Sequence, residues 1–121
     1  MKISIPRILI AATSSGSGKT TITCGLINCL KRKGFSVSSF KCGPDYIDPL
    51  FHENILGVPS GNLDSFFADD DMVKYLLGKN SLSSDISVIE GVMGYYDGLG
   101  FTSKASSAEI SNITKTPVIL I

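Results

Sequence analysis

Apolar residues along the chain alternate between short continuous runs and segments with helical spacing. The run at residues 8–12 lies between Pro6 and a cluster of serine and glycine, a pattern typical of a buried parallel strand. Residues 19–33 carry apolar positions at helical spacing and end in basic residues, and Gly34 suits a C-terminal cap. The apolar positions of this predicted helix are Ile22, Leu26, Ile27 and Leu30.

The same alternation continues to the end of the sequence. Further strands are predicted at residues 35–40, 86–89 and 118–121. Further helices are predicted at residues 69–77, with Val73, Leu76 and Leu77 facing inward, and at residues 105–113. Long loops of the kind that carry function are predicted at residues 41–61 and 91–103. We also expect three residues to lie in the hydrophobic core: Phe66, Phe67 and Met72.

This order of elements predicts an α/β fold, a parallel sheet with helices on both faces in three α/β/α layers. Binding sites in such folds gather at the carboxyl ends of the strands. The sequence stops inside an apolar strand, with no helix after it to cover the far face of that strand. We therefore expect an incomplete fragment of a longer protein, whose folding alone is marginal.

Composition narrows the ligand to a small molecule. The 121 residues are 43% hydrophobic and 18% charged, which is typical of one ordered domain. Eleven basic residues balance eleven acidic ones, so no overall field favours nucleic acid or a membrane surface as a partner. Three cysteines match neither a disulfide framework nor a zinc site and suit the cytoplasm. We expect two of them, Cys24 and Cys29, to be buried in a helix and Cys42 to lie in a loop.

A phosphate-binding loop is predicted between the first strand and the first helix. Residues 13–21 read T-S-S-G-S-G-K-T-T, in the context that a Walker A motif requires, so the predicted sheet is of the P-loop NTPase type. Glycines let backbone amides surround phosphate oxygens, and the helix N-terminus adds partial positive charge. Lys19 is expected to reach the β- and γ-phosphates of ATP, and Thr20 to coordinate Mg²⁺. The predicted nucleotide-binding residues are Ser15, Gly16, Ser17, Gly18, Lys19, Thr20 and Thr21.

The motif departs from the strict pattern at one position. The first glycine of G-x-x-x-x-G-K-[ST] falls on Thr13, after Ala12, so a chance turn rich in serine and glycine stays open as an alternative. Partition-type ATPases of the same superfamily carry an extra lysine five residues before the P-loop lysine, where this chain has Ser14. That difference disfavours a dimerising switch.

Carboxylates follow the second and third predicted strands. The loop K-C-G-P-D-Y-I-D-P-L-F-H begins with Lys41 and contains Asp45 and Asp48, whereas Glu90 ends the next strand and Asp97 follows it. The ends of parallel strands meet at one edge of a sheet, so these groups are expected beside the phosphate loop. The alternative for the two aspartates of the first loop is that they cap turns beside the neighbouring prolines.

Several motifs together resemble the cobyrinic acid a,c-diamide synthase family. They are K-C-G-P-D-Y-I-D-P, N-L-D at residues 62–64, E-G-V-M-G-Y-Y-D-G, and S-S-A-E at residues 106–109. The resemblance covers nearly the whole chain and implies that residues 1–121 are the N-terminal portion of an ATP-dependent amidoligase domain related to dethiobiotin synthetase. Members of the family amidate two acetate side chains of a corrin precursor with ATP, Mg²⁺ and ammonia from glutamine.

The resemblance also implies roles for the carboxylates. Phosphoryl transfer would convert the substrate carboxylate into an acyl phosphate, which ammonia then attacks. Glu90 and Asp45 would join Thr20 around Mg²⁺, and Lys19 and Lys41 would stabilise charge on the transferred group. The candidates for orienting the substrate or accepting a proton are Asp48 and Asp97, and those for lining its pocket are Tyr46, Tyr95 and Tyr96. His52 is expected to support the site without contacting substrate.

Part of the family's machinery has no match here. Members usually carry a glutaminase domain with a nucleophilic cysteine assisted by histidine and glutamate, and no such trio is found in these residues. We expect this chain not to hydrolyse glutamine and to depend on that partner domain of the full-length protein. A homodimer and the identity of the tetrapyrrole, whether cobyrinate, hydrogenobyrinate or nickel sirohydrochlorin, are left open.

Two other functions compete with amidation. A dethiobiotin synthetase-like ligase shares the fold and the phosphorylation step but acts on a small diamine with CO₂. A regulatory P-loop ATPase would use nucleotide as a switch without small-molecule chemistry; Ser14 and the clustered carboxylates speak against it.

Overall fold

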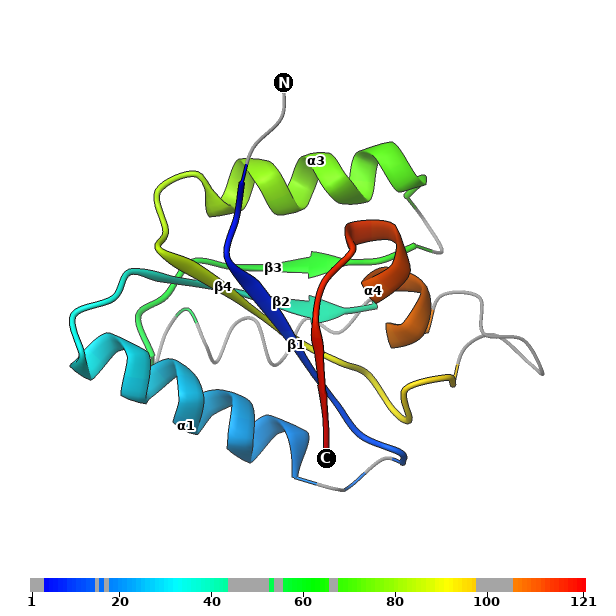
Figure 1. Ribbon diagram of the computed structural model, residues 1–121, viewed down its shortest axis with the longest axis horizontal. Coiled ribbons are helices and arrows are strands. Elements are labelled where there is room, and N and C mark those ends of the chain that lie inside the picture. The colour runs from blue at the N-terminus through cyan, green and yellow to red at the C-terminus, as the bar shows by residue number, and fades with distance from the viewer. Residues whose placement is uncertain are drawn as a thin grey trace.

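Five parallel strands form one sheet in the part of the chain that the computed structural model describes, residues 4–14, 16, 18–43, 53, 56–65, 68–97 and 106–121 (Figure 1). The strands are β1 (Arg7–Ala11), β2 (Val37–Cys42), β3 (Ser60–Leu63), β4 (Ile86–Glu90) and β5 (Val118–Leu120). Their spatial order is β3-β2-β4-β1-β5, and each neighbouring pair is parallel. The predicted parallel α/β sheet is therefore confirmed.

Helices cover both faces of the sheet. The described helices are α1 (Lys19–Arg32), α3 (Asp70–Ser81) and α4 (Ser107–Thr114). Figure 1 shows α1 below the sheet, and α3 and α4 on its opposite side. This is the three-layer arrangement expected from the sequence.

Alternating side chains of the strands supply two separate cores. Leu9 of β1 and Ile89 of β4 pack into the core beneath α3 and α4, which also contains Phe40 and Val73. The next residue of β1, Ile10, packs with Ile27 of α1 in the second core. Because side chains alternate between the faces of a strand, each buried strand contributes to both cores, which explains its continuous apolar sequence.

The helix boundaries follow from local capping. Asp69 accepts a hydrogen bond from the amide of Met72 at 2.8 Å and starts α3, and Ser106 accepts one from Glu109 at 3.2 Å and starts α4. At the end of α1, Gly34 adopts φ 91° and donates its N–H to Lys31 at 3.0 Å. The left-handed conformation favours glycine there, as the sequence predicts.

One expectation about an individual side chain, the core position of Met72, was wrong. Met72 is 47% exposed, because the buried face of α3 follows Val73 and Leu77, four residues apart. On α1, Ile22 is 45% exposed, although Ile27 is fully buried. Phe66 and Phe67 lie outside the described residues.

The cysteines also differ from the prediction. Cys42 is buried in β2 rather than placed in a loop, whereas Cys29 is exposed on α1 and Cys24 is half-buried. Burial raises the pKa of the Cys42 thiol to about 12, so this thiol stays protonated at neutral pH. It packs as a core residue.

Strand β3 was not predicted from the pattern: it begins inside the predicted loop 41–61 and ends two residues after it. Its sequence, S-G-N-L, has one large apolar residue and no alternation, so its strand character comes from pairing with β2. Ser60 and Ser39 join these strands through their hydroxyl groups, 2.6 Å apart. Strand β2 itself begins at Val37 rather than Phe35, which is 48% exposed.

None of the helices in the described ranges is both long enough and apolar enough to cross a membrane.

We predict that the core beneath α3 and α4 dominates the stability of the fold. Phe40 is 1% exposed, so Phe40→Ala should lower the free energy of unfolding by about 3–5 kcal/mol. Phe35→Ala, nearby and half exposed, should cost less than about 1 kcal/mol. Denaturant titration measures both, and equal losses would contradict the core described here.

Candidate active site

The end of the sheet beside α1 gathers charged side chains because of strand register. Lys41 in β2 and Glu90 in β4 are direct pairing partners. Glu90 lies two residues after Val88, whose side chain packs into the core on the α1 side. Because alternate residues share a face, Glu90 and its partner Lys41 point toward α1, at the carboxyl ends of their strands.

Three side chains from three elements meet there. Oε1 of Glu90 accepts a hydrogen bond from Oγ1 of Thr20 at 2.5 Å and lies 3.2 Å from Nζ of Lys41. Glu90 is 0% exposed and Lys41 is 5% exposed. A carboxylate can be kept charged at such burial only with partners of this kind. Thus the predicted meeting of Thr20, Glu90 and Lys41 is observed.

The second oxygen of Glu90 has no such contact. Oε2 is buried and lacks a hydrogen-bond partner among the described residues. Buried polar atoms are normally paired, and an unpaired one costs free energy. The geometry thus leaves one carboxylate oxygen able to take a further ligand.

The phosphate loop has the backbone expected of an anion site. Gly16 and Gly18 adopt φ 74° and φ 90°, a left-handed conformation that favours glycine. The helix starts directly after Gly18 and has no acidic residue in its own first turn, so its first amides and its dipole are suited to binding an anion. Lys19 extends back over the loop, with Nζ 3.3 Å from the carbonyl oxygen of Ser14.

The electrostatics of Lys19 favour an incoming phosphate. Burial lowers the pKa of Lys19 below its ordinary value, and the nearby charge of Lys41 lowers it further; Glu90 and Asp97 act in the opposite direction. Two cations close to each other are stabilised by an anion between them. The arrangement can therefore bind phosphate groups.

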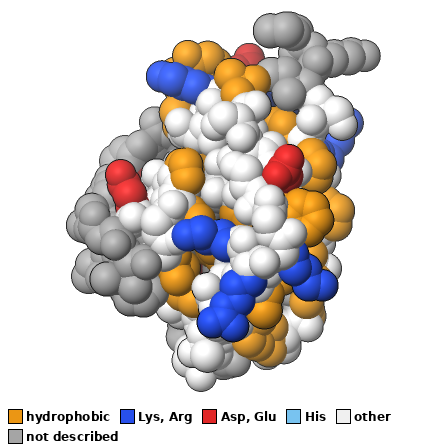
Figure 2. Space-filling view, turned by 90° about the vertical axis from the view of Figure 1, so that its left-hand side faces the viewer, with side chains coloured by type: hydrophobic (Ala, Val, Ile, Leu, Met, Phe, Trp, Pro, Cys, Tyr) orange, Lys and Arg blue, Asp and Glu red, His pale blue; other side chains and the backbone are white. Residues whose placement is uncertain are grey.

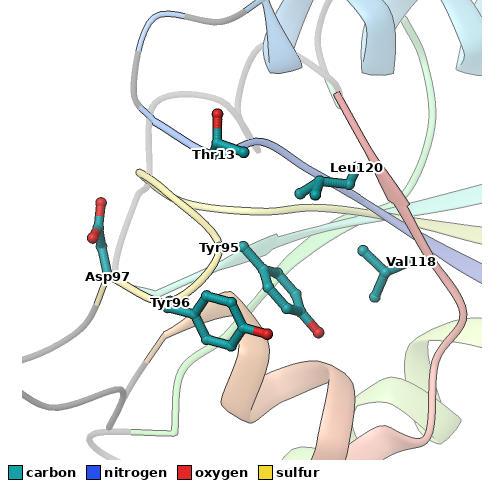
Figure 3. Close-up of a pocket in the computed structure, with 6 residues that line it drawn as sticks. All are labelled: Thr13, Tyr95, Tyr96, Asp97, Val118 and Leu120. Atoms are coloured by element: carbon teal, nitrogen blue, oxygen red, sulfur yellow. The ribbon is translucent and has the colours of Figure 1, made fainter.

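The segment after β4 brings the predicted residues Tyr95, Tyr96 and Asp97 to the same rim. The two tyrosine rings contact edge to face with centroids 4.8 Å apart. With Thr13 and Val118 they line a cavity of about 340 Å³. Figure 3 shows the tyrosines and Asp97 on one side of this cavity and Val118 with Leu120 on the other.

Other predicted site residues cannot be placed. Those outside the described residues are Ser15, Ser17, Asp45, Tyr46, Asp48 and His52. Thr21 lies in the first turn of α1 and is exposed.

Sequence reasoning missed residues that hold the segment after β4. Ser107 accepts a hydrogen bond from the amide of Val92 at 2.9 Å. The residue before Val92, Gly91, has no room for a side chain, because a Cβ there would lie 2.9 Å from Oγ of Ser107. The signal available in the sequence was the small-residue motif S-S-A-E together with the glycines that follow Glu90.

The protein groups fit a magnesium ion with few protein ligands. No cluster of three or more His, Cys, Asp or Glu side chains suited to a metal occurs within the described ranges. Mg²⁺ bound with a nucleotide commonly takes one or two protein oxygens and completes its shell with phosphates and water. Thr20 and Glu90, with the unpaired oxygen Oε2, match that donor set.

Basic residues elsewhere have a different role. Figure 2 looks onto the left-hand side of Figure 1 and shows Lys and Arg side chains gathered on its lower part. Lys31 and Arg32 lie in the last turn of α1, where positive charge is favoured by the helix dipole. That end of α1 is remote from the phosphate loop, so these basic residues stabilise the C-terminal end of the helix and take no part in the phosphate site.

Comparison with known proteins agrees with this geometry. Residues 8–111 match the family described as CobQ/CobB/MinD/ParA nucleotide binding domain. Over 117 residues the chain is 58% identical to cobyrinate a,c-diamide synthase of Listeria innocua and 49% identical to that of Thermoplasma volcanium. Over 116 residues it is 48% identical to that of Priestia megaterium.

These alignments cover 95% to 97% of this chain but only 25% to 26% of each relative. The chain thus spans about a quarter of the length of the curated relatives it matches.

We predict that Lys41 and Glu90 stabilise the fold as a pair. Lys41→Met leaves the Glu90 carboxylate buried beside Thr20 alone and should lower the free energy of unfolding by about 3–5 kcal/mol. The double change Lys41→Met with Glu90→Met should recover most of that loss, because neither member of the pair is then left as an unpaired buried charge. Denaturant titration of the double-mutant cycle measures the coupling.

The matched control is an exposed lysine. Lys79→Met removes a cation 5.9 Å from the ring of Tyr75 and should cost less than about 1 kcal/mol. A cost for Lys41→Met no larger than for this control would contradict the role of the pair.

Proposed function

The chain belongs to the CobQ/CobB/MinD/ParA nucleotide-binding domain family, and from that premise we propose that it supplies the ATP-dependent step of a cobyrinate a,c-diamide synthase. The observation that carries the proposal is the contact of Thr20 and Lys41 with the buried carboxylate of Glu90 beneath a phosphate loop. The name of the relatives supplies the substrate, cobyrinate, and the resemblance of the motifs implies that acetate side chains of the corrin are the groups amidated.

The proposed reaction has two steps. An oxygen of the substrate carboxylate attacks the γ-phosphorus of ATP, and the bond between that phosphorus and the β-phosphate oxygen breaks. ADP is released, and the substrate becomes an acyl phosphate. Ammonia then attacks the acyl carbon, a proton is lost from nitrogen, and inorganic phosphate departs to leave the amide. Both steps concentrate negative charge on the transferred group, so cations and amide donors at the loop favour them.

The described residues divide this work among them. Amides at the start of α1 and Lys19 bind the phosphates, while Lys41, fixed by Glu90, places a second cation at the same rim. Thr20 and Glu90 would hold Mg²⁺, which when bound neutralises phosphate charge and orients the phosphates. The site thereby aligns the acceptor carboxylate with the γ-phosphorus.

The cavity beside Tyr95 and Tyr96 supports a role in substrate binding. At about 340 Å³ it lies near the lower end of ligand pockets, so it has room for a side chain of a macrocycle and not for the whole ring. Asp48 and Tyr46 remain predicted substrate contacts and Asp45 a predicted metal ligand. The glutaminase domain remains a predicted partner, and a homodimer stays open.

Two alternatives are separated by chemistry. A dethiobiotin synthetase-like ligase would need the same phosphate site but a small diamine in place of the corrin. A regulatory ATPase would need no acceptor at all; the buried cation and carboxylate beside the loop favour phosphoryl transfer to an acceptor instead.

We predict that Mg·ATP affinity depends on the protonation of Lys19. The pKa of Lys19 is lowered in the free protein, and a bound triphosphate stabilises the charged ammonium and raises that pKa. Binding therefore takes up a proton at alkaline pH, and affinity should fall as the pH rises through the lowered pKa. Lys19→Arg, which stays charged, should remove this dependence.

Isothermal titration at several pH values measures this effect. Lys19→Ala should weaken Mg·ATP binding at least about tenfold at neutral pH, since it removes a charge-assisted contact. Lys33→Ala is the matched control, because it removes a lysine charge at the C-cap of α1, the end far from the phosphate loop. This variant should bind Mg·ATP like the wild type. A Lys19→Ala protein with unchanged affinity would rule out the phosphate site.

We further predict that ADP release by the full-length protein requires a corrinoid acetate. With ATP, Mg²⁺ and ammonia, a corrin carrying free a- and c-acetate groups should stimulate ADP release and gain amides detectable by mass spectrometry. A diamine with CO₂ should give no stimulation. ADP release with the diamine and CO₂, but not with the corrin, would favour the dethiobiotin-type ligase. Nucleotide-driven dimerisation without turnover would favour the regulatory ATPase.

A further inference from the structure

The segment after β4 runs alongside β1 and the start of the phosphate loop. The amide of Gly91 donates to the carbonyl of Ile10 at 2.8 Å, and the amide of Tyr95 donates to the carbonyl of Ala12 at 2.7 Å. The first contact lies at the end of the paired segment of β1 and β4, and the second lies beyond the ends of both strands. The phosphate loop therefore begins against a second piece of backbone.

The contact is closest at Gly94. A Cβ at this position would lie 2.7 Å from the carbonyl oxygen of Thr13 and 2.7 Å from Oδ2 of Asp97. Real Cβ atoms do not approach backbone oxygen so closely, so a side chain at position 94 would push the two segments apart. Thr13 stands where the strict P-loop pattern has its first glycine, and in this structure the glycine that allows close approach is Gly94.

Asp97 closes the turn that presents Gly94. Its Oδ2 accepts a hydrogen bond from the amide of Gly94 at 2.9 Å, and its own amide donates to the carbonyl of Gly94 at 3.0 Å. An aspartate that bonds backbone on both sides of a turn fixes the turn's shape. The conformation of residues 94–97 thus depends on this carboxylate.

Helix α4 supports the same turn from behind. The amide of Ala108 donates to the carbonyl of Tyr95 at 2.9 Å, and the hydroxyl of Tyr95 lies 2.7 Å from that of Ser111. The turn is therefore attached to α4 on one side and to the phosphate loop on the other.

We infer that Asp97 is a positioning residue for the phosphate loop, acting through the Gly94–Asp97 turn on the backbone of Ala12 and Thr13. The inference rests on the proposed nucleotide binding and assigns Asp97 a part in it without contact to the nucleotide. Loss of the carboxylate loosens the turn, lets residues 12 and 13 shift, and weakens binding of the triphosphate. The turn, and not the charge of Asp97, is what matters.

The test is Mg·ATP affinity of the full-length protein by isothermal titration. Asp97→Ala should bind about tenfold more weakly than the wild type, because it removes a charge-assisted hydrogen bond to the turn. Asp97→Asn should stay within about threefold, since its amide oxygen still accepts from Gly94. Gly94→Ala should also weaken binding about tenfold, with the carboxylate intact.

Asp85 provides a matched control at the opposite end of β4. Its Oδ2 accepts from the amide of Ser36 at 2.7 Å, and its own amide donates to the carbonyl of Ser36 at 2.7 Å. Asp85→Ala therefore removes the same kind of hydrogen bond, from a backbone amide to an aspartate carboxylate, at a place far from the phosphate loop. It should lower the melting temperature without changing Mg·ATP affinity. Thermal melts of all variants confirm that each is folded at the titration temperature.

Other roles of Asp97 give different results. If its charge acted directly on the site, Asp97→Ala and Asp97→Asn would change triphosphate affinity in the same direction and by a similar factor, because both remove the charge. If Asp97 only contacted substrate, both variants would bind Mg·ATP like the wild type and lose turnover alone. Either outcome, or unchanged affinity in Gly94→Ala, overturns the inference.

The proposed function can fail separately. A folded wild-type protein that bound no Mg·ATP would overturn the proposed function, and this inference with it. Wild-type binding accompanied by unchanged affinity in the turn variants would overturn the inference alone. Should Asp97→Ala not fold, the Mg·ATP affinities of Gly94→Ala and Asp85→Ala decide the inference. Weaker binding in Gly94→Ala alone supports it, and equal affinities overturn it.

Discussion

The carboxylate of Glu90 is a buried charge that the surrounding structure has to compensate. Removing such a group from water costs several kcal/mol, and it is tolerated here because Thr20 and Lys41 contact one of its oxygens. Those two partners come from different elements, the first turn of α1 and the end of β2. One side chain therefore ties the start of the phosphate loop's helix to the register between β2 and β4.

The pleat of the sheet determines which face can hold this chemistry. Lys41 lies on the α1 face, whereas its neighbours Phe40 and Cys42 pack on the opposite face beneath α3 and α4. A slip of one residue in β2 would bury the lysine in an apolar core and bring an aromatic ring to the end of the sheet beside the phosphate loop. Register and site therefore depend on each other, and the apolar face of β2 helps to keep its lysine in place.

Much of this could be predicted from the sequence, because the signals were local. The loop from Thr13 onward lies between a continuous apolar run and a helical pattern, and strand ends placed Glu90 and Lys41 beside it. Other features depend on tertiary contacts. Strand β3 exists through its pairing with β2, Met72 is exposed because α3 turns Val73 inward, and Gly94 shows its role only where it meets Thr13.

The two lysines explain how an arrangement of like charges can serve binding. In the free protein Lys19 is partly buried near Lys41, and both burial and this repulsion disfavour its charge, as its lowered pKa shows. Phosphate oxygens between the cations would remove that unfavourable interaction, so part of the cost of bringing the lysines together during folding is recovered on binding. Glu90 limits the cost beforehand by pairing with Lys41. Before any ligand binds, the folded protein therefore already holds both cations where a phosphate group would need them.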